Sequence, residues 1–180
     1  MAELYGTKNK IRVCTACALC AKRNNTVPGY GSPFAPIVAI GEAPGEKEDL
    51  QGLPFVGASG KLLGRWISNI GFDRESVFIT NTVKCRPPKN RDPKIEEINA
   101  CSPFLVEQIN AISPAVILTL GRHAANTIVG TVKPMYVHRK EGGTYTGIPV
   151  ICTYHPAYIL RNGGRGEDKV REDFIRAVRV

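Results

Sequence analysis

The stretch IVAIGEAPGEKEDLQGLPFVG, residues 37–57, decides the fold. It begins with four apolar residues, 37–40, which is typical of a short strand buried on both faces of a parallel sheet. Glycines, prolines and carboxylates then interrupt regular structure as far as Gly57. In open α/β sheets, a segment of this kind lies at the carboxyl edge, where ligands bind. The stretch therefore predicts an α/β fold with a ligand site at the end of its first strand.

The end of this stretch, Pro54-Phe55-Val56-Gly57, places an aromatic ring on a constrained turn. Carboxylates and a flat apolar ring beside tight backbone suit a small, polar, planar ligand. The alternative is a solvated acidic loop beside a core phenylalanine, and these residues alone do not decide between the two.

Length and charge limit the class of protein. The chain has 180 residues, so we expect one domain, residues 1–180, with a sizeable core. Its formal net charge of +8 favours a polyanionic partner, with nucleic acid ahead of a membrane. No apolar run is long enough to span a bilayer, and no basic-then-apolar leader is recognisable. We therefore expect a soluble protein, cytoplasmic and associated with the nucleoid.

Strands and helices alternate along the rest of the chain. Further buried strands are expected over 77–80, 114–120 and 150–153, with a small hairpin over 135–147. Helical spacing of apolar residues predicts helices over 59–70, 93–112, 121–129 and 168–180. Residues 159–166 are basic and glycine-rich. This order predicts an open sheet of about four parallel strands flanked by helices on both faces.

Polar side chains follow three of the predicted strands. The acidic loop follows the first strand, Asn81 ends the second and His155 follows the last. Because the carboxyl ends of parallel strands meet at one edge, these groups are expected to converge on one site. The alternatives are that Asn81 caps a turn and that His155, before Pro156, is a satisfied structural residue.

The chain contains six cysteines: Cys14, Cys17, Cys20, Cys85, Cys101 and Cys152. In an intracellular chain they are expected to be metal ligands or free thiols rather than disulfides. The Cys14–Cys17 pair is spaced to meet one metal centre, and Cys85 and Cys101 could complete four thiolates.

Zinc and an iron–sulfur cluster both fit this donor set. The wide spacing between Cys85 and Cys101 favours the cluster, because structural zinc more often uses two tight pairs. Three alternatives stay open: Cys85 and Cys101 are unrelated thiols, Cys20 replaces Cys17, and Cys152 is simply a small buried hydrophobe.

Five motifs together resemble one family. They are GEAPG (41–45) with Glu48-Asp49, PFVG (54–57), ITN (79–81), KCRPP (84–88) with Asn90-Arg91, and HPAY (155–158) with Leu160-Arg161-Asn162. In this order they resemble family-four uracil-DNA glycosylases, the iron–sulfur enzymes of archaea and thermophilic bacteria. The resemblance runs from Cys14 to about Asn162. It implies the uracil-DNA glycosylase-like fold and a structural 4Fe–4S cluster whose ligands are Cys14, Cys17, Cys85 and Cys101.

The implied reaction is hydrolysis of the N-glycosidic bond of uracil in single- or double-stranded DNA, after the base has been flipped into a pocket. By resemblance, Phe55 stacks on uracil and Asn81 reads its Watson–Crick edge. Glu48 matches the position that excludes the thymine methyl. Gly41 and Ala43 belong to the loop whose backbone amides help to hold the base.

The resemblance also assigns catalytic roles. His155 would donate to the developing uracil anion at O2. Better-known uracil glycosylases carry an Asp where this chain has Ala43, so the group that positions water is a hypothesis. Glu42 is the nearest substitute, with Asn90 and Glu48 as helpers.

Arginines near these motifs are expected to contact DNA. Arg86, Arg91, Arg161 and Arg165 would meet phosphates, while Leu160 with Arg161 would fill the gap left by the flipped base. A monomer is expected, and a sliding clamp or other repair proteins are the candidate protein partners.

Two rival functions remain at this point. One is a related glycosylase for other deaminated or mismatched bases. Changes at Asn81 or Glu48 would favour it, and neither residue is changed. A superfamily branch that bonds to DNA through an inserted histidine is disfavoured, because residues 84–91 contain neither histidine nor insertion. The other rival is a non-catalytic nucleic-acid-binding module with a metal centre.

Overall fold

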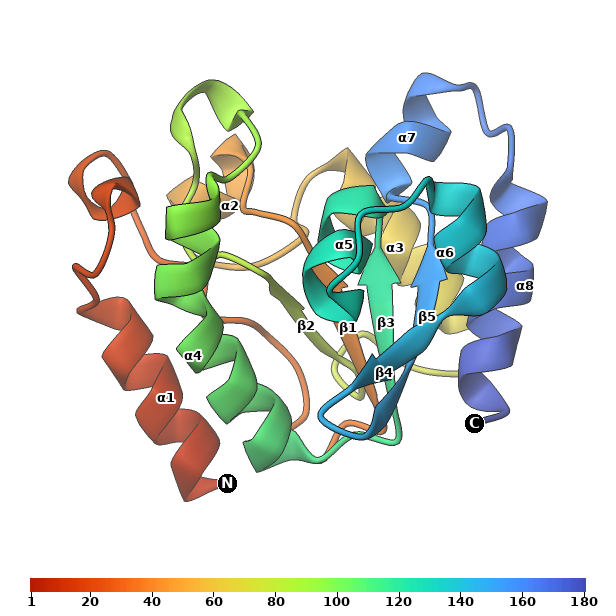
Figure 1. Ribbon diagram of the computed structural model, residues 1–180, viewed down its shortest axis with the longest axis horizontal. Coiled ribbons are helices and arrows are strands. Elements are labelled where there is room, and N and C mark those ends of the chain that lie inside the picture. Colours follow the sequence, from red (N-terminus) through yellow and green to blue (C-terminus); the bar gives the residue numbers. More distant parts are fainter.

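The sheet is parallel except at one edge. In the computed structural model, which describes residues 1–180, five strands lie in the order β2-β1-β3-β5-β4 (Figure 1). Their bounds are β1 Ile37–Gly41, β2 Phe78–Asn81, β3 Val116–Leu120, β4 Gly143–Tyr145 and β5 Ile148–Thr153. The first, second, third and fifth pair in parallel, and β4 pairs antiparallel with β5. The predicted α/β sheet of four parallel strands is confirmed, with an antiparallel edge strand added.

Helices cover both faces, as the alternation of elements predicts (Figure 1). Their bounds are α1 Ala2–Arg12, α2 Glu46–Gln51, α3 Ala58–Asn69, α4 Ile95–Ile112, α5 Arg122–Val129, α6 Met135–Glu141, α7 Pro156–Arg161 and α8 Glu167–Val178. The helices α3, α7 and α8 lie on one face, α1, α4 and α5 lie on the other, and α6 lies along β5. None of these helices combines the length and apolarity needed to cross a bilayer.

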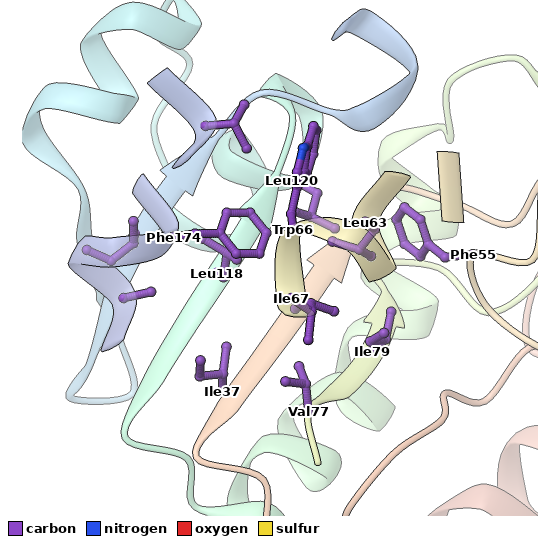
Figure 2. Close-up of a cluster of buried hydrophobic side chains, with 14 of the residues drawn as sticks. Ile37, Phe55, Leu63, Trp66, Ile67, Val77, Ile79, Leu118, Leu120 and Phe174 are labelled. Atoms are coloured by element: carbon purple, nitrogen blue, oxygen red, sulfur yellow. The ribbon is translucent and has the colours of Figure 1, made fainter. Parts of the chain in front are cut away.

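The two core clusters explain why β1 is apolar throughout. Ile37 and Ala39 face the cluster that includes α3 and α8, whereas Val38 and Ile40 face the cluster that includes α4 and α5. Both faces of the strand are therefore removed from water, as expected for a central parallel strand. Figure 2 shows the first of these clusters, with Phe55 at its margin. Phe55, near the end of the acidic loop, thus joins this loop to the core.

Two local expectations were wrong. Residues 135–141 form α6 and not a strand, and the hairpin is made by β4 and β5. Its turn residues Thr146 and Gly147 both have positive φ, 49° and 83°, as a tight hairpin requires. The acidic loop contains the short helix α2, which ends at Gly52 in the left-handed conformation. The basic segment after His155 begins with α7, because His155 and Pro156 form a regular helix start.

Candidate functional site

The end of β1 lies against both predicted base-binding side chains. Gly41 is in register with Asn81 of β2. A Cβ on Gly41 would lie 2.5 Å from the Asn81 Oδ1 atom and 2.7 Å from the Phe55 Cζ atom, so only glycine fits. Asn81 is 2% exposed and Phe55 is 7% exposed. The structure therefore brings Gly41, Phe55 and Asn81 together at the carboxyl edge.

The turn that carries Phe55 is held in an unusual conformation. Phe55 has φ 52°, a left-handed conformation that costs about 1–3 kcal/mol for a non-glycine residue. Glu48 stabilises the turn, because its Oε1 accepts hydrogen bonds from the backbone N–H groups of Val56 at 2.8 Å and Gly57 at 3.1 Å. A Cβ on Gly60 would lie 1.7 Å from the Phe55 carbonyl oxygen. Glu48 therefore fixes the aromatic ring through the backbone.

His155 follows β5 and caps α7. Its Nδ1 accepts a hydrogen bond from the Ala157 N–H at 3.1 Å, which places the ring proton on Nε2. Burial and, to a smaller extent, the nearby Arg161 lower the pKa of His155 to about 4, while the charge of Glu48 opposes them. The ring centroid lies 5.8 Å from that of Phe55. His155 is thus a neutral imidazole at physiological pH, with Nε2–H available as a donor.

Glu42 lies at the start of the acidic loop, where its backbone is firmly held. Its carbonyl oxygen accepts hydrogen bonds from Thr82 Oγ1 at 2.6 Å and from the Val83 N–H at 3.2 Å. Burial raises the pKa of the Glu42 carboxyl. The loop therefore presents a carboxylate that gains a proton more readily than an ordinary glutamate.

Two residues that the sequence analysis missed lie beside Glu42. The ligand-type atoms of Glu42, Asp92 and His123 all lie within 4.8 Å of one another. His123 Nε2 lies 3.4 Å from Asp92 Oδ2. The charge of His123 lowers the pKa of Glu42, whereas Asp92 raises it. Because His123 lies in the first turn of α5, three residues after the end of β3, the strand-end argument that identified Asn81 and His155 could also have identified it.

Asn90 and Arg91 are engaged elsewhere. Asn90 Oδ1 accepts a hydrogen bond from Arg86 Nε at 2.8 Å, and no hydrogen bond joins Asn90 to Glu42. Arg91 makes a two-point ion pair with Glu97 at 2.8 and 2.6 Å, at the start of α4. The structure thus gives the Arg91 guanidinium an intramolecular partner instead of leaving it free for phosphate.

The tip of α7 is exposed to solvent. Leu160 is 46% exposed, Arg161 is also exposed, and the two follow His155 within one short helix. Tyr158 of the same helix stacks on Tyr154, with centroids 5.1 Å apart. Leu160 and Arg161 are thus exposed within the helix that His155 caps, and their contact with DNA stays a prediction.

The cysteines converge on one pocket away from the Phe55 ring. Five cysteines line it: Cys14, Cys17, Cys20, Cys85 and Cys101. Cys152 lies in the second core cluster and is fully buried. Ala43 packs against Val83 and the buried cysteines, so it lies on the cysteine side of the loop. The structure therefore brings Cys85 and Cys101 to the Cys14–Cys17 pair.

The chemistry of this pocket fits a thiolate-ligated metal centre. The pocket is largely apolar, and burial raises the pKa of Cys85 to about 11 and raises that of Cys101 as well. A bound metal would reverse this effect, since a coordinating thiol is deprotonated. Arg23 Nη1 donates to Cys85 Sγ at 3.2 Å, and the Lys84 backbone N–H donates to Cys101 Sγ at 3.3 Å. Soft donors flanked by cations suit zinc or an iron–sulfur cluster.

An open parallel sheet with a buried phenyl ring, a buried amide and a half-buried imidazole at its carboxyl edge has the architecture of α/β proteins that bind small ligands at this edge. Residues 28–179 match the model of the uracil DNA glycosylase superfamily. The chain belongs to this superfamily.

Three relatives carry the same name. The chain is 50% identical to the type-4 uracil-DNA glycosylase of Saccharolobus solfataricus, over 86% of this chain and 76% of the relative. It is 47% identical to the enzyme of Sulfurisphaera tokodaii, over 90% of this chain and 78% of the relative. It is 45% identical to the enzyme of Archaeoglobus fulgidus, over 89% of this chain and 84% of the relative. The resemblance to family-four enzymes found from the sequence motifs is confirmed.

Proposed function

We propose that this protein is a monofunctional uracil-DNA glycosylase, which hydrolyses the N-glycosidic bond of uracil in DNA and leaves an abasic site for base excision repair. The observation that carries the proposal is that Asn81 and Phe55 meet at Gly41, with the His155 ring centroid 5.8 Å from that of Phe55. The type-4 relatives support it by name.

The pocket can distinguish uracil from cytosine. A flipped uracil would stack on the Phe55 ring, and the Asn81 amide would donate to O4 and accept from N3–H. Cytosine presents the reverse pattern at these two atoms, so a correctly oriented amide leaves it unpaired in a buried site. Glu48 fixes the turn that carries the Phe55 ring. We propose that its side chain also blocks the space that the methyl group of thymine would occupy.

The reaction separates charge, and we assign side chains of the site to the charges that develop. As the bond between sugar C1′ and uracil N1 breaks, the electron pair leaves with uracil and positive charge develops on the sugar. The neutral His155 donates its Nε2–H to uracil O2 and stabilises the anion without transferring a proton. Glu42 orients the water that attacks C1′ and receives its proton, with Asp92 and His123 adjusting the charge of that carboxylate.

The pH profile tests these roles. Glu42 must be ionised, so the rate should fall as the pH drops through its raised pKa, above the usual 4.5. His155 becomes charged only near pH 4, and its pKa should not shape the profile at higher pH. We expect single-turnover rates to be constant at neutral pH and to fall on the acid side. In Glu42→Gln the rate should be lower, and its fall at acid pH should be absent. The same fall in the variant as in the wild type would show that Glu42 has no role in the reaction.

We further propose that Cys14, Cys17, Cys85 and Cys101 hold a 4Fe–4S cluster. The pocket, its flanking cations and the wide spacing of the last two cysteines support it. Bound there, the cluster would crosslink the amino-terminal segment, the loop after β2 and α4 without taking part in hydrolysis. Cys20 and Cys152 are left as free thiols.

Cysteine variants test the ligand set. We expect Cys85→Ser to lose most of its iron and its visible absorption, and to melt at a lower temperature, because bound metal stabilises only the folded chain. Cys20→Ser is the matched control, because Cys20 lines the same pocket but is spare. Iron loss in Cys20→Ser with retention in Cys85→Ser would contradict this assignment, and zinc in the wild-type protein would contradict the cluster.

The DNA contacts are proposed on the exposed side of the pocket. Leu160 would enter the gap left by the flipped base, while Arg161 and Arg86 would meet phosphates. Arg91 is less suited to this role because Glu97 neutralises it. We propose that the protein acts as a cytoplasmic monomer on single- or double-stranded DNA.

Base specificity tests the proposed function. Oligonucleotides carrying one uracil, cytosine, hypoxanthine or mismatched thymine would be incubated with the protein, and the free base measured. We expect release of uracil alone. Release of hypoxanthine or thymine without uracil would establish the related glycosylase instead, and binding of all four without release would establish a binding module.

A further inference from the structure

Lys84 is an unusual lysine because its whole side chain is enclosed. It is 1% exposed and is among the largest fully buried side chains of the protein. No carboxylate forms an ion pair with it, although nine such pairs occur elsewhere in the structure. A buried ammonium without a counter-charge is strongly unfavourable. Negative charge from another group nearby would therefore stabilise the Lys84 ammonium.

The ammonium reaches the strand end that carries the base-reading amide. Lys84 Nζ donates to Thr80 Oγ1 at 2.6 Å and to the Asn81 backbone carbonyl at 2.8 Å. Both acceptors belong to the last two residues of β2. Thr80 is itself completely buried, so neither contact is exchanged for water. Lys84 thus fixes the peptide from which the Asn81 side chain projects.

The same residue lies against the cysteine centre. Lys84 lines the cysteine pocket, directly precedes Cys85, and donates its backbone N–H to Cys101 Sγ at 3.3 Å. Four thiolates around a metal carry a net negative charge, since each ligating thiol has lost its proton. A centre bound in this pocket would therefore supply negative charge beside Lys84, whose ammonium has no carboxylate partner.

We infer that Lys84 is a positioning residue that couples the cysteine centre to uracil recognition, its ammonium being held by the negative charge of the centre while it fixes the Asn81 peptide. The inference rests on the proposed function and on the proposed cluster. It adds to that proposal a second role for the centre, which is to stabilise the base-reading amide electrostatically in addition to tying loops together.

Two substitutions separate the charge from the hydrogen bonds. Lys84→Met keeps the length and apolar volume of the side chain but removes the charge and the hydrogen bonds. Lys84→Gln removes the charge and keeps a hydrogen-bond donor. Lys89→Met is the matched control, because Lys89 is exposed in the same loop and makes no ion pair. The readouts are iron content, the reduction potential of the bound cluster and the dissociation constant of free uracil, which needs no DNA contact.

In Lys84→Met we expect iron to be retained, the reduction potential to fall, and free uracil to bind about tenfold or more weakly. The potential falls because a nearby positive charge favours the more negative, reduced cluster. Lys84→Gln should show the same direction of potential shift with a smaller loss of uracil affinity, and Lys89→Met should match the wild type.

An iron-loaded, uracil-releasing wild-type protein whose Lys84→Met variant keeps both its potential and its uracil affinity would overturn the inference and leave the proposed function standing. If Lys84→Met does not fold, an unchanged potential in Lys84→Gln overturns it equally. Absence of iron from the wild-type protein, or of uracil release, would instead overturn the proposals on which the inference rests.

Discussion

His155→Ser is expected to slow uracil release by about 10²–10³-fold in single-turnover assays, the range seen when one preorganised donor to a developing anion is removed. The lost group is the Nε2–H, which the neutral ring holds ready because Nδ1 accepts from the Ala157 N–H. Serine is the informative replacement, since its hydroxyl can still cap α7. The fold should therefore survive while the donor disappears.

The control for this variant is its melting temperature, together with binding of an oligonucleotide that lacks uracil. Both should be close to the wild-type values, because the residues of α7 and the exposed cations are unchanged. A rate within about threefold of the wild type, in a protein that melts normally, would show that His155 is only a helix cap.

Asn81→Ala is expected to lower kcat/KM for uracil by a similar factor, about 10²–10³-fold. The Asn81 side chain is 2% exposed, so water cannot replace the lost amide without reorganising the pocket. Uracil O4 and N3–H would then be buried without partners, at about 1–3 kcal/mol for each unsatisfied group. The measurement is steady-state release of free uracil from a labelled oligonucleotide.

Asn81→Ala leaves a cavity as well as removing the amide, and a second variant separates these two effects. Asn81→Asp keeps the shape of the side chain but offers only acceptors, so its kcat/KM for uracil should fall as far as that of Asn81→Ala. Asn99→Ala serves as the control for loss of an amide, because Asn99 is exposed on α4. If Asn81→Asp retained wild-type kcat/KM on uracil, the amide would not read the base.

The features that could be predicted from the sequence share one property: local pattern determines them. The apolar residues 37–40 predict a strand covered on both sides, and β1 is such a strand. Placing Asn81 and His155 at strand ends then required only the rule that parallel strands share one carboxyl edge. Trp66 stands at helical spacing among apolar residues, a pattern that predicts a core position, and it is 3% exposed.

The features that were missed depend on contacts between distant segments. Residues 135–141 alternate in the sequence, but α6 packs along β5, and its buried His138 lies 2.7 Å from Asn126 Oδ1 of α5. Arg91 belongs to a basic loop by composition, yet Glu97 engages it at the start of α4.

The burial of Lys84 could not be read from its neighbours either. Composition assigns it to a basic, proline-containing loop, which predicts a solvated cation. The loop instead folds inward because Cys85 and Cys101 are gathered into the cysteine pocket, and the lysine is enclosed between that pocket and the end of β2. A single sequence does not reveal such an arrangement, because it arises from three separated segments.

The central claim is that the side chains at the carboxyl edge of the sheet form a pocket that excises uracil. The most direct measurement is alkali-sensitive cleavage of an end-labelled oligonucleotide with one deoxyuridine, run in parallel with wild-type protein, His155→Ser and Asn81→Ala. The account predicts a break at the uracil position with the wild type, nearly abolished in both variants although both remain folded. Equal breakage by all three proteins, or none by an iron-loaded wild type, would contradict it.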